Sequence, residues 1–336
     1  MATQQLTSSL GSAPGVPPVA ATQNYSRPLA IVTTLFFMWG LLTCLNDILI
    51  PRLKSIFDLS YSRVMLVQFA FFSAYFLFSL PWSKIVNRIG YQRTMVAGLL
   101  TMALGAFLFL PAASTASYPL FLTALIILGC GITGLQVAAN PYVVVLGKPE
   151  TAPCRLDLTQ AFNSLGTTIA PKLGGLLILV AAPLALEQVG RLTTPALHLY
   201  RVQLANSVKM PYAVIGGALL LLAVLIGMVK LPKLEAAAAL RPGEKVNDSI
   251  WKHPNLLFGV IGLFTYVGAE VAIGSFLVNY FGLPTIAGLS ASSAAGFVSF
   301  YWGGAMIGLL PVLCYLYILF YALSGSKPNS ERYARA

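Results

Sequence analysis

Four side-chain amides lie inside two apolar runs of this sequence, where hydrocarbon side chains are expected. Gln136 and Asn140 are four residues apart in the first run, and Gln160 and Asn163 are three apart in the second. If the runs are helices, each pair lies on one face. Amides on facing helices predict the lining of a polar cavity inside a membrane protein. The alternative is hydrogen bonding between helices, worth ~0.6 kcal/mol on average.

Asp47 is one of two acids within the predicted membrane spans. Insertion scales put an acid near the centre of a spanning helix at roughly 2.5 to 3.5 kcal/mol, a cost that usually marks function. In the run FFMWGLLTCLNDILIP, Phe36, Trp39, Thr43 and Asp47 recur at helical spacing, and such a stripe would suit a sugar ring and a proton. The alternative is that Asp47 lies near the outer end of its span and caps it or pairs with Arg52.

Glu270 is the second acid within a span. At helical spacing it shares a face with Tyr266 and Gly274, whereas Asn279 lies nine residues on and falls on the opposite face of a straight helix. Asn279 therefore joins a common site only if this helix is broken. The alternative role for Glu270 is to pair with Lys172, the one base that lies well inside a predicted span.

The composition is that of an integral membrane protein, with 57% hydrophobic residues, 9% charged residues and a mean hydropathy of +0.78. The basic residues behind the net charge of +11 are spread over loops and tails, so no nucleic-acid surface is expected. Four cysteines without paired spacing indicate neither a disulfide framework nor a metal site. With two loop histidines, no HExxH and no Walker A sequence, we expect neither an enzyme nor an ATP-driven pump.

Eight runs are long enough to span about 30 Å of hydrocarbon at ~20 residues each. A ninth, 311–324, is short and is predicted to be a partial or re-entrant helix. A charged link of Lys148, Glu150, Arg155 and Asp157 is predicted to be a solvated turn. The eight spans are predicted at 28–50, 65–83, 94–112, 119–146, 158–182, 211–231, 254–281 and 292–310.

The distribution of lysine and arginine predicts a cytoplasmic N-terminus. In that orientation eleven basic residues face the cytoplasm and six face outward. The inner ones are Arg27, Lys84, Arg88, Arg93, Lys148, Arg155, Lys230, Lys233, Arg241, Lys245 and Lys252, and the outer ones are Arg52, Lys54, Arg63, Arg191, Arg201 and Lys209.

Five motifs resemble one family: FFMWGLLTCLNDILIP, GLQVAANPYVVVLG, LTQAFNSLGTTIAP, YVGAEVAIGSFLVNYF and SFYWGGAM. They look like the fucose/galactose/glucose:proton symporter branch of the major facilitator superfamily, nearest its glucose/galactose transporters, from about residue 28 to about 308. The superfamily's loop signature survives in part as SKIVNRIGYQR, in which Ser83 and Asn87 depart from the pattern and Arg88, Gly90 and Arg93 fit it.

The resemblance implies an all-α, polytopic membrane protein of the major facilitator fold. The composition and the polar links divide it into five predicted parts. These are a disordered cytoplasmic tail (1–27), a six-helix N-terminal half (28–230), a cytoplasmic linker (231–253), a partial C-terminal half (254–324) and a polar tail (325–336). The protein would lie in the bacterial inner membrane.

The resemblance also implies a mechanism, alternating access about a midplane sugar site, with a proton as coupling ion and no cofactor. A glutamate of the fucose permease falls on Gln136, which cannot titrate, so proton coupling would rest on Asp47, with Glu270 from the second half. Amides and aromatics suit a hexose. The implied sugar-binding residues are Phe36, Trp39, Asn46, Gln136, Asn140, Gln160, Asn163, Tyr266 and Asn279.

Similarity to the family stops at Leu309, and 83 residues follow the linker, enough for two helices and part of a third. We therefore expect a C-terminally truncated carrier, with a transport-inactive membrane fragment as the alternative. A passive channel would need a continuous polar lane. The polar positions instead cluster in one layer, which favours a binding site.

Overall fold

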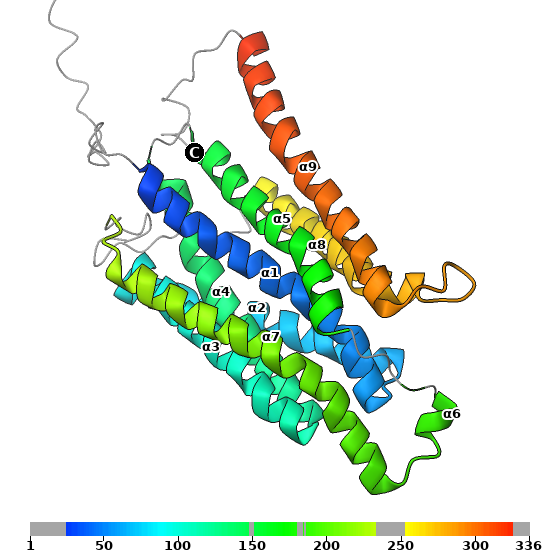
Figure 1. Ribbon diagram of the computed structural model, residues 1–336. Coiled ribbons are helices and arrows are strands. Elements are labelled where there is room, and N and C mark those ends of the chain that lie inside the picture. The colour runs from blue at the N-terminus through cyan, green and yellow to red at the C-terminus, as the bar shows by residue number, and fades with distance from the viewer. Residues whose placement is uncertain (1–24, 148–150, 180–183, 185, 233–252, 325–336) are drawn as a thin grey trace, which may run out of the picture.

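The computed structural model describes residues 25–147, 151–179, 184, 186–232 and 253–324 (Figure 1). All the regular elements in those ranges are helices. The predicted tails 1–27 and 325–336, the linker 231–253, Lys148 and Glu150 lie wholly or mostly outside the described residues. The helices are α1 (Ser26–Phe57), α2 (Tyr61–Ile89), α3 (Tyr91–Thr115), α4 (Tyr118–Val145), α5 (Ala152–Leu177), α6 (Leu186–Val189), α7 (Thr194–Met228), α8 (Pro254–Phe281) and α9 (Ala291–Ser324).

Each predicted span corresponds to one of the eight long helices. Within the described residues, six of these are apolar and long enough to cross a membrane: α1, α2, α3, α4, α7 and α8. The prediction for 311–324 was wrong, because this stretch continues α9 without a break. Hydropathy marks only the part of a helix that suits hydrocarbon, whereas backbone hydrogen bonding carries several helices well beyond it.

The clearest such extension is at the end of α1. The helix passes through Pro51 and ends at Phe57, so Arg52, predicted in an outer loop, lies within the helix and is only 2% exposed. Its guanidinium donates a hydrogen bond to the carbonyl of Ile178, directly after α5. Arg52 therefore connects the ends of two neighbouring helices.

Arg155 corrects the predicted turn between α4 and α5. Both Arg155 and Asp157 lie in the first turns of α5. The Arg155 guanidinium donates to the carbonyls of Val143 and Val144, at 3.1 and 2.8 Å. The last carbonyls of a helix have no partner within it, so this side chain caps α4 from the start of α5.

The helices pack in a connected bundle in which α3 lies between α4 and α7, α2 against α4, and α5 between α1 and α9 (Figure 1). Close approach depends on small residues, as is usual for membrane helices. Gly40 of α1 and Gly166 of α5 each lie against the backbone of the other helix, where a Cβ would overlap it. Helix α8 differs from these, because it packs mainly on α9 and contacts α1 over a short stretch.

Candidate polar site between the helices

Asp47 lies at a junction of three helices rather than at the end of α1. It is 5% exposed. Its Oδ1 accepts hydrogen bonds from Nε2 of Gln68 on α2, at 2.5 Å, and from the hydroxyl of Ser275 on α8, at 3.0 Å. Gln68 Nε2 also donates to Ser275 Oγ. The carboxyl group thus connects α1, α2 and α8.

Asn46 belongs to the same network although it is the neighbour of Asp47 in the chain. Its Nδ2 donates to Gln68 Oε1 at 2.7 Å. Successive residues of a helix point about 100° apart, so Asn46 and Asp47 diverge. The Gln68 side chain lies between them and contacts both. The Asn46 Oδ1 atom is buried without a hydrogen-bond partner among the described residues.

Trp302 of α9 and the Asp47 carboxyl both lie close to Gly274 of α8. A Cβ placed on Gly274 would stand 3.0 Å from the Trp302 ring and 3.7 Å from Asp47 Oδ2. Any larger residue at position 274 would therefore press against the Trp302 ring. The indole Nε1 is a buried donor without a partner in the described part of the chain.

The predicted residues of the α1 stripe are divided between different contacts. Phe36 and Trp39 form a tilted ring pair with centroids 5.1 Å apart. Asn163 of α5 donates from Nδ2 to the Phe36 carbonyl at 3.1 Å, so its amide joins α1 to α5. Gln160 is half-buried one turn earlier on α5.

The amides of α4 lie nearer to α2. Gln136 Nε2 lies 3.5 Å from the Tyr75 hydroxyl, and Thr43 of α1 lies beside the same hydroxyl. Asn140 is half-buried, and its Oδ1 has no hydrogen-bond partner among the residues described. A second polar layer therefore lies between α1, α2 and α4.

Glu270 and Tyr266 are brought together on α8. The Tyr266 hydroxyl donates to Glu270 Oε1 at 3.2 Å, although Tyr266 is largely exposed. Tyr301 of α9 donates to the Glu270 backbone carbonyl at 3.4 Å and lies within electrostatic reach of Asp47. Lys172, considered as a partner for Glu270, is exposed on α5.

Asn279 stands apart from these groups. Helix α8 is unbroken from Pro254 to Phe281, so the break that would carry Asn279 to the face of Glu270 is absent there. Asn279 lines a separate cavity of about 430 Å³ with residues from the end of α1, including Lys54 and Asp58.

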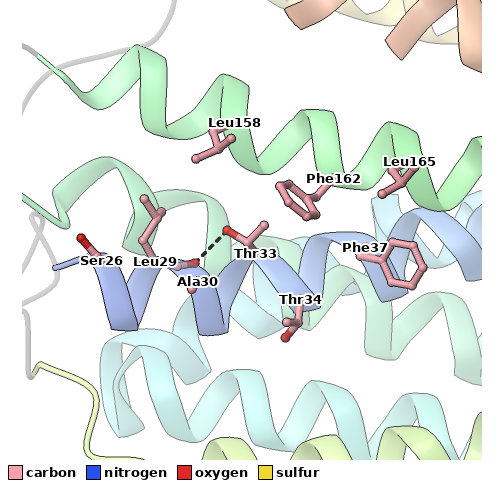
Figure 2. Close-up of a pocket in the computed structure, with 9 residues that line it drawn as sticks. All are labelled: Ser26, Leu29, Ala30, Thr33, Thr34, Phe37, Leu158, Phe162 and Leu165. Carbon is pink, nitrogen blue, oxygen red and sulfur yellow. Dashed lines mark hydrogen bonds between the residues drawn. The ribbon is translucent and has the colours of Figure 1, made fainter. Parts of the chain in front are cut away.

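A larger cavity, about 700 Å³, lies between the N-terminal halves of α1 and α5 (Figure 2). Leu158, Phe162 and Leu165 face it from α5. The Thr33 hydroxyl donates to the carbonyl of Leu29 in its own helix, at 2.7 Å. With few polar atoms to offer, this cavity suits hydrocarbon better than a sugar.

Three residues at or near the Asp47 junction were not predicted from the sequence: Gln68, Ser275 and Trp302. A single amide in an apolar run was a detectable signal for Gln68, but its partners depend on how α1 and α2 pack. Serine and tryptophan are ordinary in membrane helices and gave no signal. In the described residues, no group of three histidine, cysteine, aspartate or glutamate side chains could hold a metal ion.

Comparison with known proteins identifies the family of this chain. The family model of the Major Facilitator Superfamily matches residues 29–326. The chain belongs to the major facilitator superfamily. Among its relatives in that superfamily, a glucose/galactose transporter of Brucella abortus biovar 1 (strain 9-941) is 50% identical over 290 residues, which are 86% of this chain and 66% of the relative. The L-fucose-proton symporter of Escherichia coli (strain K12) is 35% identical, over 83% of this chain and 64% of the symporter.

The solved structures of the superfamily include a similar one. A crystal structure of the transporter FucP in the outward conformation superposes with a TM-score of 0.70 at 34% identity, covering 85% of this chain and 70% of FucP. The all-helical, multi-pass fold expected from the sequence is thereby confirmed. The chain spans about two thirds of the length of the relatives it matches.

The superfamily's loop signature has a defined geometry here. Helix α2 ends at Ile89 and α3 begins at Tyr91, so Gly90 alone joins them. Its φ of +81° favours glycine. Gln92, two residues later, donates to the carbonyls of Ile226 and Val229 at the end of α7, at 2.8 and 2.6 Å. The loop therefore fixes α3 against the end of α7.

Proposed function

We propose that this chain forms the sugar- and proton-binding part of a secondary active transporter that takes up a hexose together with a proton, by alternating access. Glucose and galactose are the proposed substrates, with fucose as a further candidate. No cofactor takes part in this proposal, because the coupling ion is the proton itself.

The observation that carries the proposal is the Asp47 carboxyl at the junction of α1, α2 and α8. Its two hydrogen-bond donors, Gln68 and Ser275, are neutral, so they do not cancel the charge of a carboxylate. Protonation removes that charge and with it the electrostatic cost of moving the site through a low-dielectric environment. A proton moving down 100 mV supplies ~2.3 kcal/mol, enough to concentrate a sugar some tens of fold. Glu270 is the proposed second titratable group.

Sugar binding is assigned to the polar and aromatic groups around this layer. Amides donate and accept hydrogen bonds as sugar hydroxyls do. Asn140 Oδ1 and Asn46 Oδ1 are buried acceptors without partners in the described part of the chain, as expected of groups that await a ligand. Trp39, which is half-buried, is the ring proposed for the apolar face of a hexose, and the fully buried Phe36 packs beside it. The proposed set also includes Gln136, Gln160, Asn163 and Tyr266, and more distantly Asn279.

The names of the relatives support the same substrate class. The Brucella relative is named a glucose/galactose transporter and the Escherichia coli relative an L-fucose-proton symporter. Both names contain a hexose, and one also contains a proton. We therefore propose a hexose as the substrate of this chain and a proton as its coupling ion.

The test is uptake of labelled glucose, galactose and fucose into vesicles that contain the 336-residue chain, with and without a proton gradient. We expect gradient-dependent uptake of at least one hexose, lost in Asp47→Asn. Phe264→Ala, a change to a side chain that is 79% exposed, is the control for handling and insertion. Uphill uptake that persists in Asp47→Asn would contradict the coupling role, and no uptake from well-inserted protein would favour the transport-inactive alternative.

The proposed orientation has a cytoplasmic N-terminus in the bacterial inner membrane, and the excess of basic residues on that side supports it. A membrane-impermeant maleimide, applied to intact cells, would test it. We expect a cysteine at Ser8 to be protected and a cysteine at Leu192, after α6, to react. The reverse pattern would overturn the orientation.

A further inference from the structure

Gln68 occupies the centre of the polar junction and uses both ends of its side chain there. Its Oε1 accepts from Asn46 Nδ2 at 2.7 Å. Its Nε2 donates to Asp47 Oδ1 at 2.5 Å and to Ser275 Oγ. With 8% of its surface exposed, Gln68 is buried.

The charge of Asp47 dictates which way this amide points. An ionised carboxylate only accepts hydrogen bonds, so the Gln68 atom facing it must be the nitrogen. The Gln68 oxygen, Oε1, then faces Asn46 and accepts the hydrogen bond from Asn46 Nδ2. A hydrogen bond to an ionised group is roughly twice as strong as one between neutral groups. The amide is therefore held most firmly when Asp47 carries its charge.

The same amide is a polar connection to α8, a helix with little other support. None of the most apolar window of α8 is buried. A groove of about 620 Å³ lies between α8 and α2, and Gln68 from α2 and Ser275 from α8 are among the residues that line it. At this groove, the Gln68–Ser275 bond and the Ser275–Asp47 bond connect α8 to α2 and α1.

We infer that Gln68 is a positioning residue, which stabilises the Asp47 carboxylate and ties it through Ser275 to α8, so that protonation of Asp47 weakens the attachment of α8. The inference rests on the proposed function for its role in transport. Gln68 itself takes up no proton and need not touch the sugar. It sets the pH at which Asp47 becomes protonated, and it transmits that protonation to the contacts that hold α8.

Few other titratable groups lie near Asp47 among the residues that the structure describes. Cys44 lies one turn before it on α1 and interacts with it electrostatically. From α9, Tyr301 is in electrostatic reach of both acids, and α8 brings Glu270 with its partner Tyr266. Gln68 and Ser275 are the groups that hydrogen-bond the Asp47 carboxyl, so changing Gln68 acts directly on Asp47.

The first test is the pH profile of sugar uptake in Gln68→Leu. Losing the amide removes a donor to the carboxylate, so we expect the midpoint of the profile to move to higher pH by roughly one unit, tenfold in proton concentration. Gln92→Leu is the matched control, because Gln92 is also an amide that joins two helices but donates to the carbonyls of Ile226 and Val229. An unmoved midpoint in Gln68→Leu, or an equal shift in Gln92→Leu, would overturn the inference.

The second test does not depend on transport. The melting temperature of purified protein is measured against pH in the wild type and in Asp47→Asn, and the difference between the two curves isolates the contribution of Asp47. The same pair is measured with Gln68→Leu added to both proteins. We expect the difference curve to lie at higher pH when Gln68 is replaced. If the wild type takes up no sugar, the proposed function fails, whereas the difference curve still decides the role of Gln68; a curve unchanged by Gln68→Leu refutes it.

The tie to α8 is tested with Ser275→Ala. At a pH where Asp47 is ionised, we expect the losses of melting temperature in Gln68→Leu and Ser275→Ala not to add in the double variant, because both break one network. Ser73→Ala is the control, since the Ser73 hydroxyl donates to the Ala70 carbonyl of its own helix, and its loss should add to that of Gln68→Leu. Full additivity with Ser275→Ala would show that the tie is absent.

Discussion

Helices α4 and α8 are both apolar and long enough to span a membrane, yet they are held in opposite ways. In the most apolar window of α4, 56% of the residues are buried inside the protein, against 0% in α8. Helix α4 packs on α2 and α3, whereas α8 has α9 as its main neighbour. The apolar side chains of α4 are largely covered by other helices, whereas those of α8 are mostly exposed.

The comparison shows that hydropathy measures suitability for the membrane and not attachment to the bundle. Without a hydrophobic driving force between helices in lipid, association depends on close packing and on polar contacts. The tightly packed helices use glycines and stacked rings. Helix α8 has such contacts with α9, at Gly274 and at the Phe281–Phe297 ring pair. The hydrogen bonds of Ser275 join it to α1 and α2. Matched substitutions in the two regions should therefore have unequal effects.

The largest difference is expected between two phenylalanines. Phe109 of α3 is fully buried and stacks on Tyr212 of α7 with ring centroids 3.9 Å apart, whereas Phe264 of α8 is 79% exposed. Phe109→Ala should lower the free energy of unfolding by ~3–5 kcal/mol, and Phe264→Ala by no more than ~0.5 kcal/mol. Unfolding of both variants in one detergent measures this, and similar losses would refute the contrast.

A smaller difference is expected between two glycines. At Gly40 a Cβ would overlap the Asn163 carbonyl of α5, whereas a Cβ at Gly217 of α7 meets nothing within 4 Å. Gly40→Ala must separate α1 from α5 and should cost ~1–3 kcal/mol. Gly217→Ala should be neutral or stabilise by up to ~1 kcal/mol, because alanine favours helix. Melting temperatures of the two variants would test this, and a stable Gly40→Ala protein would contradict the close approach.

The smallest effect is expected at Glu270. Its carboxylate is bonded by Tyr266 on a helix that few residues cover, so Glu270→Gln should change the free energy of unfolding by at most ~0.5 kcal/mol. In the uptake assay it should lower gradient-driven accumulation less than Asp47→Asn does, since the Asp47 network joins three helices. Equal losses in the two variants would show that the acids act as one unit.

The positions of the helices could be predicted from the sequence, because a length of apolar residues that matches the bilayer is a local property. The ends were less predictable. Hydropathy gave no sign that α1 continues past Pro51 or that α7 begins at Thr194, since these turns are polar but still form helix. Nor did it indicate that 311–324 belongs to α9.

The candidate site was predicted in part, and for a comparable reason. Asp47 and the four amides are unusual in apolar runs, so their residue types alone were enough to predict them as site candidates. Which groups meet is decided by the packing of helices distant in sequence. Asn163 therefore reaches a carbonyl of α1, and Gln68, a single amide without a periodic partner, takes the central place beside Asp47. No local pattern carries that information.

The contact of α3 with α7 also has a consequence for biogenesis. Synthesis proceeds from the N-terminus at ~5–20 residues per second, and α4, α5 and α6 are made between these two helices. For several seconds the Phe109 face of the nascent α3 has no Tyr212 to stack on and must remain against lipid or the insertion machinery. Assembly of the bundle is thus delayed until a late helix emerges, and a ribosome stalled before α7 would leave that aromatic face unprotected.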